Sequence, residues 1–462
     1  KANRSRSSVT SISTSSPGSA PATKTARPSG RRPTEPPRDS GPEVRTVAAP
    51  VVWEGGMGRD GIVAGVADSQ TVLIEVHGPD RPGITSALLA LLHDLRAMVG
   101  DVEQVVVRGH LVLSVLAELP HGTPLEPLER FGTDRGLVVQ LDEVDATPTE
   151  RRLGVGVTVI ASSVPADVRE GARELAPADL GAVADAIARR GGNIDRIVRL
   201  SRYPVFSYEL TVLGAPIDDL RTELVEVARE RSIDIAIQPD GLGRRSQRLV
   251  VMDVDSTLIQ DEVIELLAEE AGCLAEVAAI TERAMAGELD FEASLRARVR
   301  LLAGLSADAL PRALARMQPT PGARTFVRTL KAMGFRVAIV SGGFTYFTDH
   351  LRELFDLDHA FANELEIVDG CLTGEVVGRV VDRRRKAELL EAVAELEGIP
   401  LDQTVAVGDG ANDLDMLAAA GLGIAFNAKP VVAEAADAAL SVPYLDAILF
   451  LLGIRESEVP DL

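Results

Sequence analysis

Features that define several protein classes are scarce or absent in this chain. Only two cysteines occur among its 462 residues, Cys273 and Cys371, and they lie far apart without forming a C-x-x-C unit. A disulfide framework or a thiolate zinc site is therefore not expected, and a reducing cytoplasm fits. No stretch approaches the roughly 18 uninterrupted apolar residues of a membrane span, so we expect a cytoplasmic protein without a membrane segment.

Positive charge is also in deficit. The 48 Lys and Arg residues are outnumbered by 69 Asp and Glu residues, which gives a formal net charge of −21. Because the phosphate backbones of nucleic acids select basic surfaces, this balance argues against a nucleic-acid binder. It does not exclude a small anionic substrate, whose site needs only local positive charge. At about 150 residues per domain, the length predicts three units.

Apolar periodicity is missing from the start of the chain, which is rich in Ser, Thr, Pro and Arg. Such a segment cannot bury enough surface to offset its ordering entropy, so we expect a disordered basic tail over residues 1–66. Its composition resembles an organellar transit peptide, and a dispensable tail is the alternative. The lack of an apolar h-region argues against a secretory signal.

Two similar patterns of strands and helices follow the tail. The first predicts a strand, a helix and two strands, over Thr71–Val76, Ile84–Met98, Asp101–Val107 and His110–Glu118. The second predicts the same order, over Val155–Ile160, Leu180–Arg190, a strand from Gly192, and Tyr208–Leu213. We interpret these as tandem copies of one small α+β module, at residues 67–148 and 149–245. An insertion, Pro165–Ala178, stands in the second copy where the first has the turn Gly78–Gly83.

The last part of the chain, residues 246–462, alternates buried strands with helices. Its continuous apolar runs predict strands over Leu249–Asp253, Arg336–Val340 and Thr404–Val407, with helices over Ala323–Met333 and Lys386–Leu396. Apolar strands separated by helices indicate an α/β fold with a doubly wound parallel sheet. Ligands of such sheets bind at the carboxyl ends of the strands.

Acidic residues follow the first of these strands. Asp253 and Asp255, in the run Asp253-Val254-Asp255-Ser256-Thr257, would face one cavity at the strand end. One carboxylate can act as a nucleophile while the other moves protons, and a divalent cation offsets their repulsion. The alternative is an acidic turn that caps a helix, since Asp and Ser also favour N-caps.

A second acidic strand end weakens that alternative. Asp409 and Asp413, in Gly408-Asp409-Gly410-Ala411-Asn412-Asp413, follow the strand that ends at Val407. Carboxylate oxygens suit Mg²⁺, which prefers hard ligands. A structural glycine turn would explain this motif by itself, but it does not explain two acid-rich strand ends in one sheet.

Two further motifs fit an anionic ligand. Ser341-Gly342-Gly343 closes the strand that begins at Arg336, and a hydroxyl with exposed amides at a helix start is suited to phosphate. Lys386 could neutralise a transferring phosphoryl group. Taken alone, the first is a common loop composition and the second an ordinary surface lysine, so both roles depend on the acidic motifs.

In this order the four motifs resemble those of the haloacid dehalogenase superfamily, and within it those of the phosphoserine phosphatases. The resemblance covers about the last 210 residues. It implies a Mg²⁺-dependent phosphomonoesterase that forms an aspartyl-phosphate in the last step of serine biosynthesis. The implied roles are a nucleophile (Asp253), a general acid/base whose carbonyl also ligates Mg²⁺ (Asp255), phosphoryl binding (Ser341, Gly342, Gly343 and Lys386), a metal ligand (Asp409), support of the metal shell (Asp413) and a substrate contact (Asn412).

The resemblance also implies a small helical cap over residues 258–318, which would exclude water from the site. Within it, Glu262 would pair with the ammonium of phosphoserine and Arg298 with its carboxylate. Met285 and Phe291 would line the apolar side. Ordinary helix-surface charge is the alternative for Glu262 and Arg298.

The first α+β module resembles an ACT domain, with Gly78–Gly83 matching its ligand-loop motif, and the second resembles it more weakly. The resemblance implies a homodimer or larger oligomer, with serine or another amino acid bound near Asp80 and Gly83. A purely structural dimerisation module is the alternative. For the whole chain, the competing functions are another phosphatase or phosphotransferase of the superfamily and a non-catalytic amino-acid sensor. A fragment of a membrane-embedded transport ATPase is disfavoured because no apolar stretch is long enough.

Overall fold

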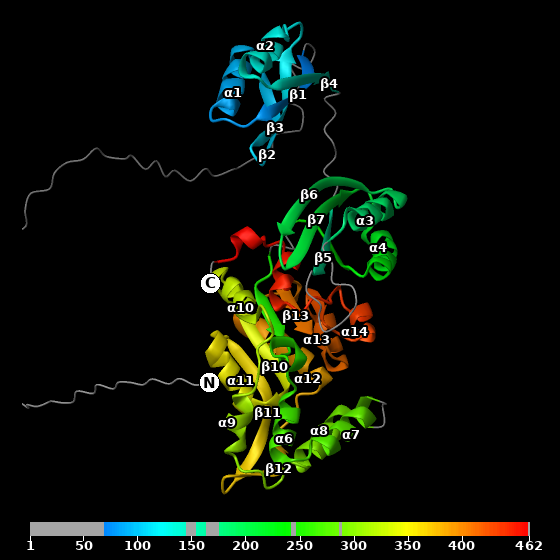
Figure 1. The fold of residues 1–462 in the computed structure, drawn as a ribbon, viewed down its shortest axis with the longest axis vertical. Helices are drawn as coiled ribbons and strands as arrows, with labels where there is room; N and C mark the ends of the chain where they lie inside the picture. Colours follow the sequence, from blue (N-terminus) through cyan, green and yellow to red (C-terminus); the bar gives the residue numbers. More distant parts are fainter. Residues whose placement is uncertain (1–68, 145–153, 163–174, 242–245, 286–288, 461–462) are drawn as a thin grey trace, which may run out of the picture. The chain divides into compact units, whose positions relative to one another are not determined.

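The computed structural model describes residues 69–144, 154–162, 175–241, 246–285 and 289–460 (Figure 1). They form two compact units, divided after Thr147. The tail predicted over residues 1–66 lies outside the described residues. Within the described ranges no helix is long and apolar enough to cross a membrane. Cys273 and Cys371 are both free thiols.

The first unit is one βαββαβ module. Its elements are β1 (Ser69–Pro79), α1 (Ile84–Asp94), β2 (Met98–Val107), β3 (His110–Pro120), α2 (Glu126–Arg135) and β4 (Val138–Glu143). The antiparallel sheet has the order β2-β3-β1-β4, and alternate residues of β1 are buried against the helices. The helix predicted to reach Met98 ends at Asp94, because Arg96 has a φ of 59° and Met98 already pairs with β3.

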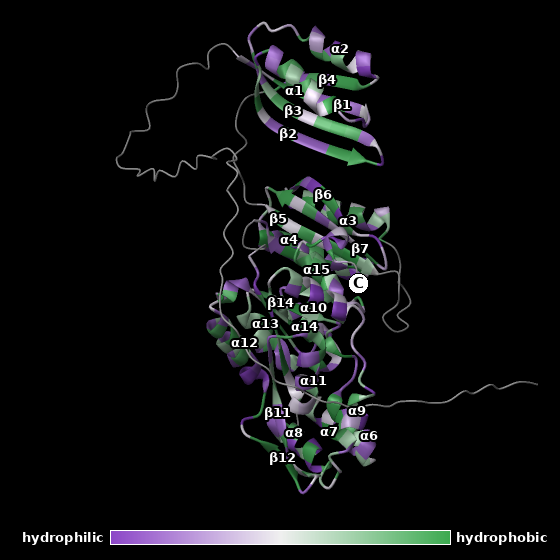
Figure 2. Ribbon diagram, turned by 90° about the vertical axis from the view of Figure 1, so that its left-hand side faces the viewer, coloured by the Kyte–Doolittle hydropathy of each residue, from purple (hydrophilic) through white to green (hydrophobic). Residues whose placement is uncertain are grey.

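The face of this sheet opposite the helices carries a row of exposed valines. Val105, Val112, His77 and Val138 are successive register partners across β2, β3, β1 and β4, so their side chains share that face. Val105 is 47% exposed and Val138 66% exposed. The hydropathy colouring shows the same apolar character at the end of the edge strand β2 (Figure 2).

The second module repeats this topology inside the second unit. Its elements are β5 (Val155–Ser162), α3 (Pro177–Arg189), β6 (Asn193–Ser201), β7 (Val205–Leu213), α4 (Ile217–Arg231) and β8 (Asp234–Pro239). The sheet order β6-β7-β5-β8 matches that of the first module strand for strand. Most of the predicted insertion, residues 165–174, lies outside the described residues, and its last residue, Ala178, belongs to α3.

A seven-stranded sheet forms the rest of the second unit, in the order β12-β11-β10-β9-β13-β14-β15. The strands are β9 (Leu249–Met252), β10 (Arg336–Phe344), β11 (His359–Val368), β12 (Cys371–Val377), β13 (Thr404–Gly408), β14 (Leu422–Phe426) and β15 (Ala438–Leu440). All neighbours pair in parallel except β11 and β12. The doubly wound parallel sheet predicted from the sequence is therefore confirmed.

Helices cover both faces of this sheet because its central strands are apolar on both sides. Val250 and Met252 of β9 pack in the cluster that contains α10 (Ala323–Ala332), α11 (Thr345–Phe355) and α15 (Ile448–Leu451). Leu249 and Val251 pack on the other face. The helices on that face are α12 (Arg383–Glu397), α13 (Leu414–Ala419) and α14 (Pro430–Ala435).

A helical insertion lies between β9 and β10. It comprises α6 (Val263–Ala271), α7 (Leu274–Met285), α8 (Phe291–Arg300) and α9 (Ala309–Leu314). These helices gather beside β11 and β12, and α8 contacts β12 (Figure 1). The range predicted for a cap, residues 258–318, includes these four helices.

The second module packs on the seven-stranded domain through the sheet face opposite its own helices. Ile160 and Ala236 on that face belong to the large core cluster of the domain. The Asp234 carboxylate accepts hydrogen bonds from the Ser441 amide and hydroxyl, each 2.8 Å long. This face corresponds to the valine-bearing face of the first module, and here apolar side chains cover it.

Candidate active site

The site forms where three neighbouring strands end. Parallel β9 lies between β10 and β13, and Asp253 and Asp409 directly follow β9 and β13, while Ser341 lies within β10. Because parallel strands point the same way, their carboxyl ends meet at one edge of the sheet. The predicted catalytic residues are brought together for that reason.

Asp253 lies at the bottom of this edge and is 3% exposed. Its amide donates to the Val407 carbonyl (2.9 Å), which ties the turn to β13, and its Oδ1 accepts from the Val254 amide (2.7 Å). Burial and, next, the charge of Asp413 raise the pKa of Asp253 well above its usual value, while Lys386 opposes the rise. The carboxylate therefore needs positive charge beside it to stay ionised.

Lys386 supplies part of that charge from the first turn of α12. Its side chain is fully buried, and Nζ lies 2.7 Å from Asp253 Oδ2 and 2.7 Å from Asp413 Oδ1. Burial disfavours the ammonium, but the two carboxylates outweigh it and raise the pKa of Lys386 above its usual value. The lysine stays charged, and it is not the surface lysine that the sequence left as an alternative.

Asp255 is held in one orientation by two donors. Its Oδ1 accepts from the Val263 amide (2.8 Å) at the start of α6, and its Oδ2 accepts from the Ser341 hydroxyl (2.9 Å). Burial raises the pKa of Asp255, against the lowering effect of these hydrogen bonds. A carboxyl group with a raised pKa is better suited to carry a proton and donate it than one at its usual pKa.

Three carboxylates are arranged so that they could hold a cation. Asp253, Asp409 and Asp413 each offer an oxygen, and these atoms lie within 4.8 Å of one another. Burial, then the charge of Asp413, raises the pKa of Asp409 to about 6. An all-oxygen donor set with more negative charge than Lys386 can neutralise fits a hard divalent cation.

The segment Ser341-Gly342-Gly343 interrupts the pairing of β10 with β11 beside these carboxylates. The Gly343 amide donates to the Ser341 hydroxyl (2.7 Å). A Cβ at Gly343 would lie 3.1 Å from an Asp255 carboxylate oxygen, and one at Gly342 would lie 2.9 Å from the Phe291 ring. Glycine therefore lets the backbone approach both the Asp255 carboxylate and Phe291, the first residue of α8.

Two charged residues of the helical insertion face the site. Glu262 accepts a hydrogen bond from the Ser256 hydroxyl (2.9 Å), and its carboxylate interacts electrostatically with Asp255. The Arg298 Nε atom is buried and has no hydrogen-bond partner among the described residues. Burial lowers the pKa of Arg298, and Glu262 is the first of the acidic groups that oppose this. A buried guanidinium with an unused donor suits an anionic group of a ligand.

The remaining predicted residues are placed as follows. Asn412 lies in the short turn Ala411–Asp413 with its side-chain oxygen against Gly410. The Met285 backbone ends α7, but its side chain is not described. Asp80 and Gly83 lie in the first unit, exposed in the turn between β1 and α1, where the Asp80 amide donates to the Gly109 carbonyl (2.8 Å).

Three polar residues of the site region were not predicted from the sequence. The Thr257 hydroxyl donates to Asp409 Oδ1 (3.2 Å), and the Thr320 hydroxyl donates to the Thr257 carbonyl (2.7 Å). Asn363, on β11, hydrogen-bonds to the Ser341–Gly343 segment. Thr257 stood inside an identified motif, whereas Thr320 and Asn363 belong to none, so their sequence context carried no signal.

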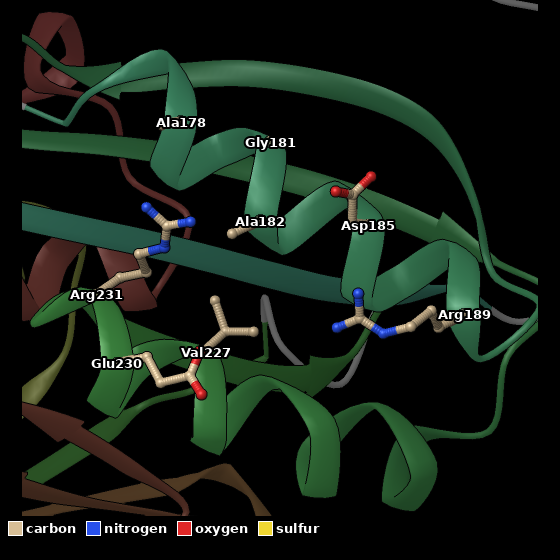
Figure 3. A pocket seen from close by; sticks show the side chains of 8 residues that line it. All are labelled: Ala178, Gly181, Ala182, Asp185, Arg189, Val227, Glu230 and Arg231. Carbon is tan, nitrogen blue, oxygen red and sulfur yellow. The ribbon is translucent and has the colours of Figure 1, made fainter.

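A separate groove of about 430 Å³ lies between α3 and α4 of the second module (Figure 3). It is lined by Ala178, Gly181, Ala182, Asp185, Arg189, Val227, Glu230 and Arg231. None of the predicted site residues lies in it, and its mixed charges and open shape show no assembled set of ligand-binding groups.

Comparisons with known proteins match all three modules. Residues 250–418 match the haloacid dehalogenase-like hydrolase family, and residues 70–131 and 172–238 each match an ACT domain family. Over 400 residues, 85% of the chain and 94% of the relative, the sequence is 52% identical to a phosphoserine phosphatase of Streptomyces coelicolor. A phosphoserine phosphatase of Mycobacterium tuberculosis is 47% identical over 84% of this chain and 94% of its own.

A solved structure shows the same similarity. The unliganded form of a probable phosphoserine phosphatase from Vibrio cholerae is 35% identical, with a TM-score of 0.51. The match covers 67% of this chain and 89% of that one.

Replacing Lys386 by Met tests the charge balance of the site. Without a divalent cation at neutral pH, we expect Lys386→Met to lower the free energy of unfolding by about 3–5 kcal/mol, because buried carboxylates lose their only ammonium partner in the described site. The loss should shrink as pH falls, since raised pKa values let Asp253 and Asp409 become neutral. Urea unfolding with EDTA from pH 8 to pH 5 measures both effects.

Lys331→Met is the matched control. Lys331 is partly exposed and lies outside the site, where its Nζ pairs with Asp358 Oδ2 at a distance of 2.9 Å. Because Asp358 keeps the Arg336 guanidinium and the Val337 amide as partners, losing Lys331 should cost only about 1 kcal/mol or less. Equal losses for the two variants at pH 8 would contradict the proposed charge balance.

Proposed function

Because this chain belongs to the phosphoserine phosphatases of the haloacid dehalogenase-like hydrolases, we propose that it hydrolyses O-phospho-L-serine to serine and phosphate in the cytoplasm, as the last step of serine biosynthesis. The observation that carries the proposal is the carboxylate cluster of Asp253, Asp409 and Asp413, with Lys386 Nζ 2.7 Å from Asp253. We divide the chain into ACT domains at residues 67–148 and 149–245 and a phosphatase domain at 246–462.

The donor set supports Mg²⁺ as the cofactor. We assign Asp253, the Asp255 carbonyl and Asp409 as its ligands, with Asp413 supporting them. The donors are oxygens, and burial together with mutual repulsion raises the pKa values of Asp253 and Asp409, so a divalent cation there relieves an existing charge imbalance. When bound, it supplies positive charge to the phosphoryl oxygens.

The chain's own residues then divide the chemistry between them. Asp253 attacks phosphorus, forming the aspartyl-phosphate as the bond to the serine oxygen breaks, and Asp255 gives its proton to that oxygen. A water molecule next attacks phosphorus and gives a proton to Asp255, and the bond to Asp253 breaks to release phosphate. Lys386 holds Asp253 Oδ2 at 2.7 Å, so the nucleophile enters the reaction in a fixed orientation.

Substrate choice is assigned to the helical insertion. The buried Arg298 Nε donor suits the carboxylate of phosphoserine, and Glu262 suits its ammonium. We assign the apolar side to Phe291, whose ring lies 2.9 Å from where a Cβ at Gly342 would stand, and, from the sequence alone, to Met285. Ser341, Gly342, Gly343 and Asn412 contact the phosphoryl group or the substrate in this proposal.

A substrate panel tests the proposed activity. We expect turnover of phosphoserine with Mg²⁺ to exceed that of glycerol phosphate and p-nitrophenyl phosphate, and EDTA to abolish it. Asp253→Asn should lower kcat by about 10⁴-fold or more, because an amide cannot form the acyl-phosphate. Asp356→Asn, at the exposed end of α11, is the control and should leave kcat unchanged.

Near-normal turnover by Asp253→Asn would eliminate the covalent mechanism. Equal activity on all the phosphomonoesters would instead favour a broad phosphatase of the same superfamily.

The pH dependence of substrate binding tests the role of Glu262. Withdrawal from bulk water, and next the charge of Asp255, raises the pKa of Glu262 to about 7. As pH falls through 7 the carboxylate becomes neutral and loses its attraction for the substrate ammonium, so KM for phosphoserine should rise. Glu262→Gln should raise this KM at pH 8 by about tenfold or more. It should also remove the rise in KM near pH 7 that the protonation of Glu262 causes in the parent.

Phosphoglycolate is the control substrate, because it keeps the phosphate and the carboxylate but lacks the ammonium, together with one carbon of the chain between them. The KM of phosphoglycolate changes with pH only because its phosphate group titrates, and Glu262→Gln should leave this KM unchanged. A phosphoserine KM that follows the phosphoglycolate KM at every pH would remove Glu262 from ammonium recognition.

We further propose that the first ACT domain joins two copies of the chain and binds serine or another amino acid near Asp80 and Gly83. The apolar row of Val105, Val112 and Val138 supports this, because the same face of the second domain is covered by the phosphatase core. The Asp80 amide donates to Gly109 between β2 and β3, so the ligand turn adjoins the edge of that face.

Charge on the valine row tests both parts of this proposal. Val105→Lys combined with Val138→Lys should convert the oligomer to monomer in sedimentation velocity and abolish the heat of serine binding. Asp80→Ala should abolish serine binding and leave the oligomer intact. Val431→Lys, 59% exposed on α14, is the control for added charge. An unchanged oligomer in the double variant would rule out this surface.

A further inference from the structure

Asn363 is a fully buried polar residue that the proposed mechanism does not use. It lies on β11, is 1% exposed, and makes hydrogen bonds only to main-chain atoms of other segments among the described contacts. Its Nδ2 donates to the carbonyls of Gly342 (2.8 Å) and Gly343 (3.3 Å), and its Oδ1 accepts from the Val381 amide (2.8 Å).

The strand register explains why the Gly342 and Gly343 carbonyls need such a partner. Val340 of β10 pairs with Phe361 of β11, but the next pair is Phe344 with Asn363. The intervening residues of β10, Ser341 to Gly343, thus bulge out of the ladder, and their carbonyls lose the neighbouring strand's amides. The Asn363 carboxamide replaces the missing donors.

This replacement also determines where the Gly343 amide points. In a trans peptide the carbonyl of Gly342 and the N–H of Gly343 point in opposite directions. With the carbonyl held by Asn363, the N–H points toward the Ser341 hydroxyl (2.7 Å), which in turn donates to Asp255. If this peptide rotated, a carbonyl oxygen would replace the N–H beside the Ser341 hydroxyl, and the segment proposed to contact the phosphoryl group would lose that hydrogen bond.

The other end of the carboxamide holds a second part of the site. Val381 precedes Asp382, whose side chain caps α12 by accepting from the Arg385 amide (2.7 Å). Lys386 lies in the first turn of the same helix, and its amide donates to the Asp382 carbonyl (3.0 Å). Asn363 therefore links the Ser341–Gly343 segment to the helix start that carries the buried lysine.

From this geometry we infer that Asn363 is a positioning residue for phosphoryl binding, which acts by fixing the Gly342–Gly343 peptide and the start of α12. The inference deepens the proposed function and rests on it. A residue that merely satisfied buried polar groups would affect stability, but the folded fraction would bind phosphate normally. The two roles therefore differ in a measurable way.

Binding of inorganic phosphate to the full chain with Mg²⁺ is the test, measured by calorimetry for Asn363→Asp and Asn363→Ser. We expect both folded variants to bind phosphate at least about tenfold more weakly and to lose about 10²-fold in kcat, because a preorganised donor is lost. Inhibition by free serine, which lacks the phosphate, should stay within about twofold of the parent.

The aspartate variant adds a signature that a structural role would not produce. A protonated carboxyl can again donate to the Gly342 carbonyl, whereas a carboxylate repels it. Relative to the parent at the same pH, Asn363→Asp should thus regain phosphate affinity as pH falls, and Asn363→Ser should not. If the aspartate variant does not fold, the serine variant alone decides through its phosphate affinity.

Thr404→Val is the matched control, because Thr404 is fully buried and hydrogen-bonded at the opposite end of β13. It should lose stability and keep its phosphate affinity. Phosphate affinities of the folded Asn363 variants within twofold of the parent would overturn the inference. Failure of the proposed function is a separate result, since it requires that the parent chain itself does not hydrolyse phosphoserine.

Discussion

The buried ammonium of Lys386 is the interaction on which the rest of the site depends. It lies 2.7 Å from carboxylate oxygens of both Asp253 and Asp413, in a position closed to water. Without it, burial would raise the pKa of Asp253 further and favour its neutral form, which is a poor nucleophile. One lysine does not balance all the carboxylates, so the same cluster has the charge and the oxygen donors that a divalent cation would need. The fold buries the carboxylates, and positive charge beside them is what keeps Asp253 ionised for the proposed reaction.

The position of Lys386 depends on several segments of the chain being held in fixed places relative to one another. β9 lies between β10 and β13, so the turns after these strands form one continuous edge. Asp382 fixes the first turn of α12, and Asn363 ties that turn to the bulge in β10. Buried main-chain groups need partners, and each of these side chains supplies one where the regular sheet does not. Hydrogen bonds between side chains and main chain therefore help to hold the site in place.

The second ACT domain is connected to this edge through the end of the chain. Asp234 binds Ser441, the nearby Leu445 amide donates to the Pro321 carbonyl (2.8 Å), and the adjacent Thr320 hydroxyl donates to Thr257 beside Asp409. Two copies of one module thus have different surroundings. The sheet face that supports the phosphatase domain in the second copy carries exposed valines in the first, and the sequence of the second has the insertion Pro165–Ala178 where the first has its Gly78–Gly83 turn.

Much of the architecture was predictable because it follows from local patterns. Apolar runs marked β9, β10 and β13, and the order of acidic and glycine-rich motifs after them indicated both the sheet and the chemistry. The helix over Ile84–Met98 was predicted too long, since the apolar pattern continues past Asp94 while the chain turns at Arg96 to form β2. The β11–β12 hairpin, β14 and β15 were not predicted; β12 and β15 are the edge strands of the sheet and β15 has only three residues, so their apolar period is weak.

The sequence by itself determined which residue types stand at the ends of the central strands. Because neighbouring parallel strands point the same way, those ends lie side by side at one edge of the sheet. Only the tertiary structure decided that Lys386 is buried rather than exposed, that Asn363 bridges two segments of the site, and that one ACT sheet is covered by the phosphatase domain. The physical reason is that periodicity reports which face of an element is buried. It does not report which residue of a distant element lies against that face.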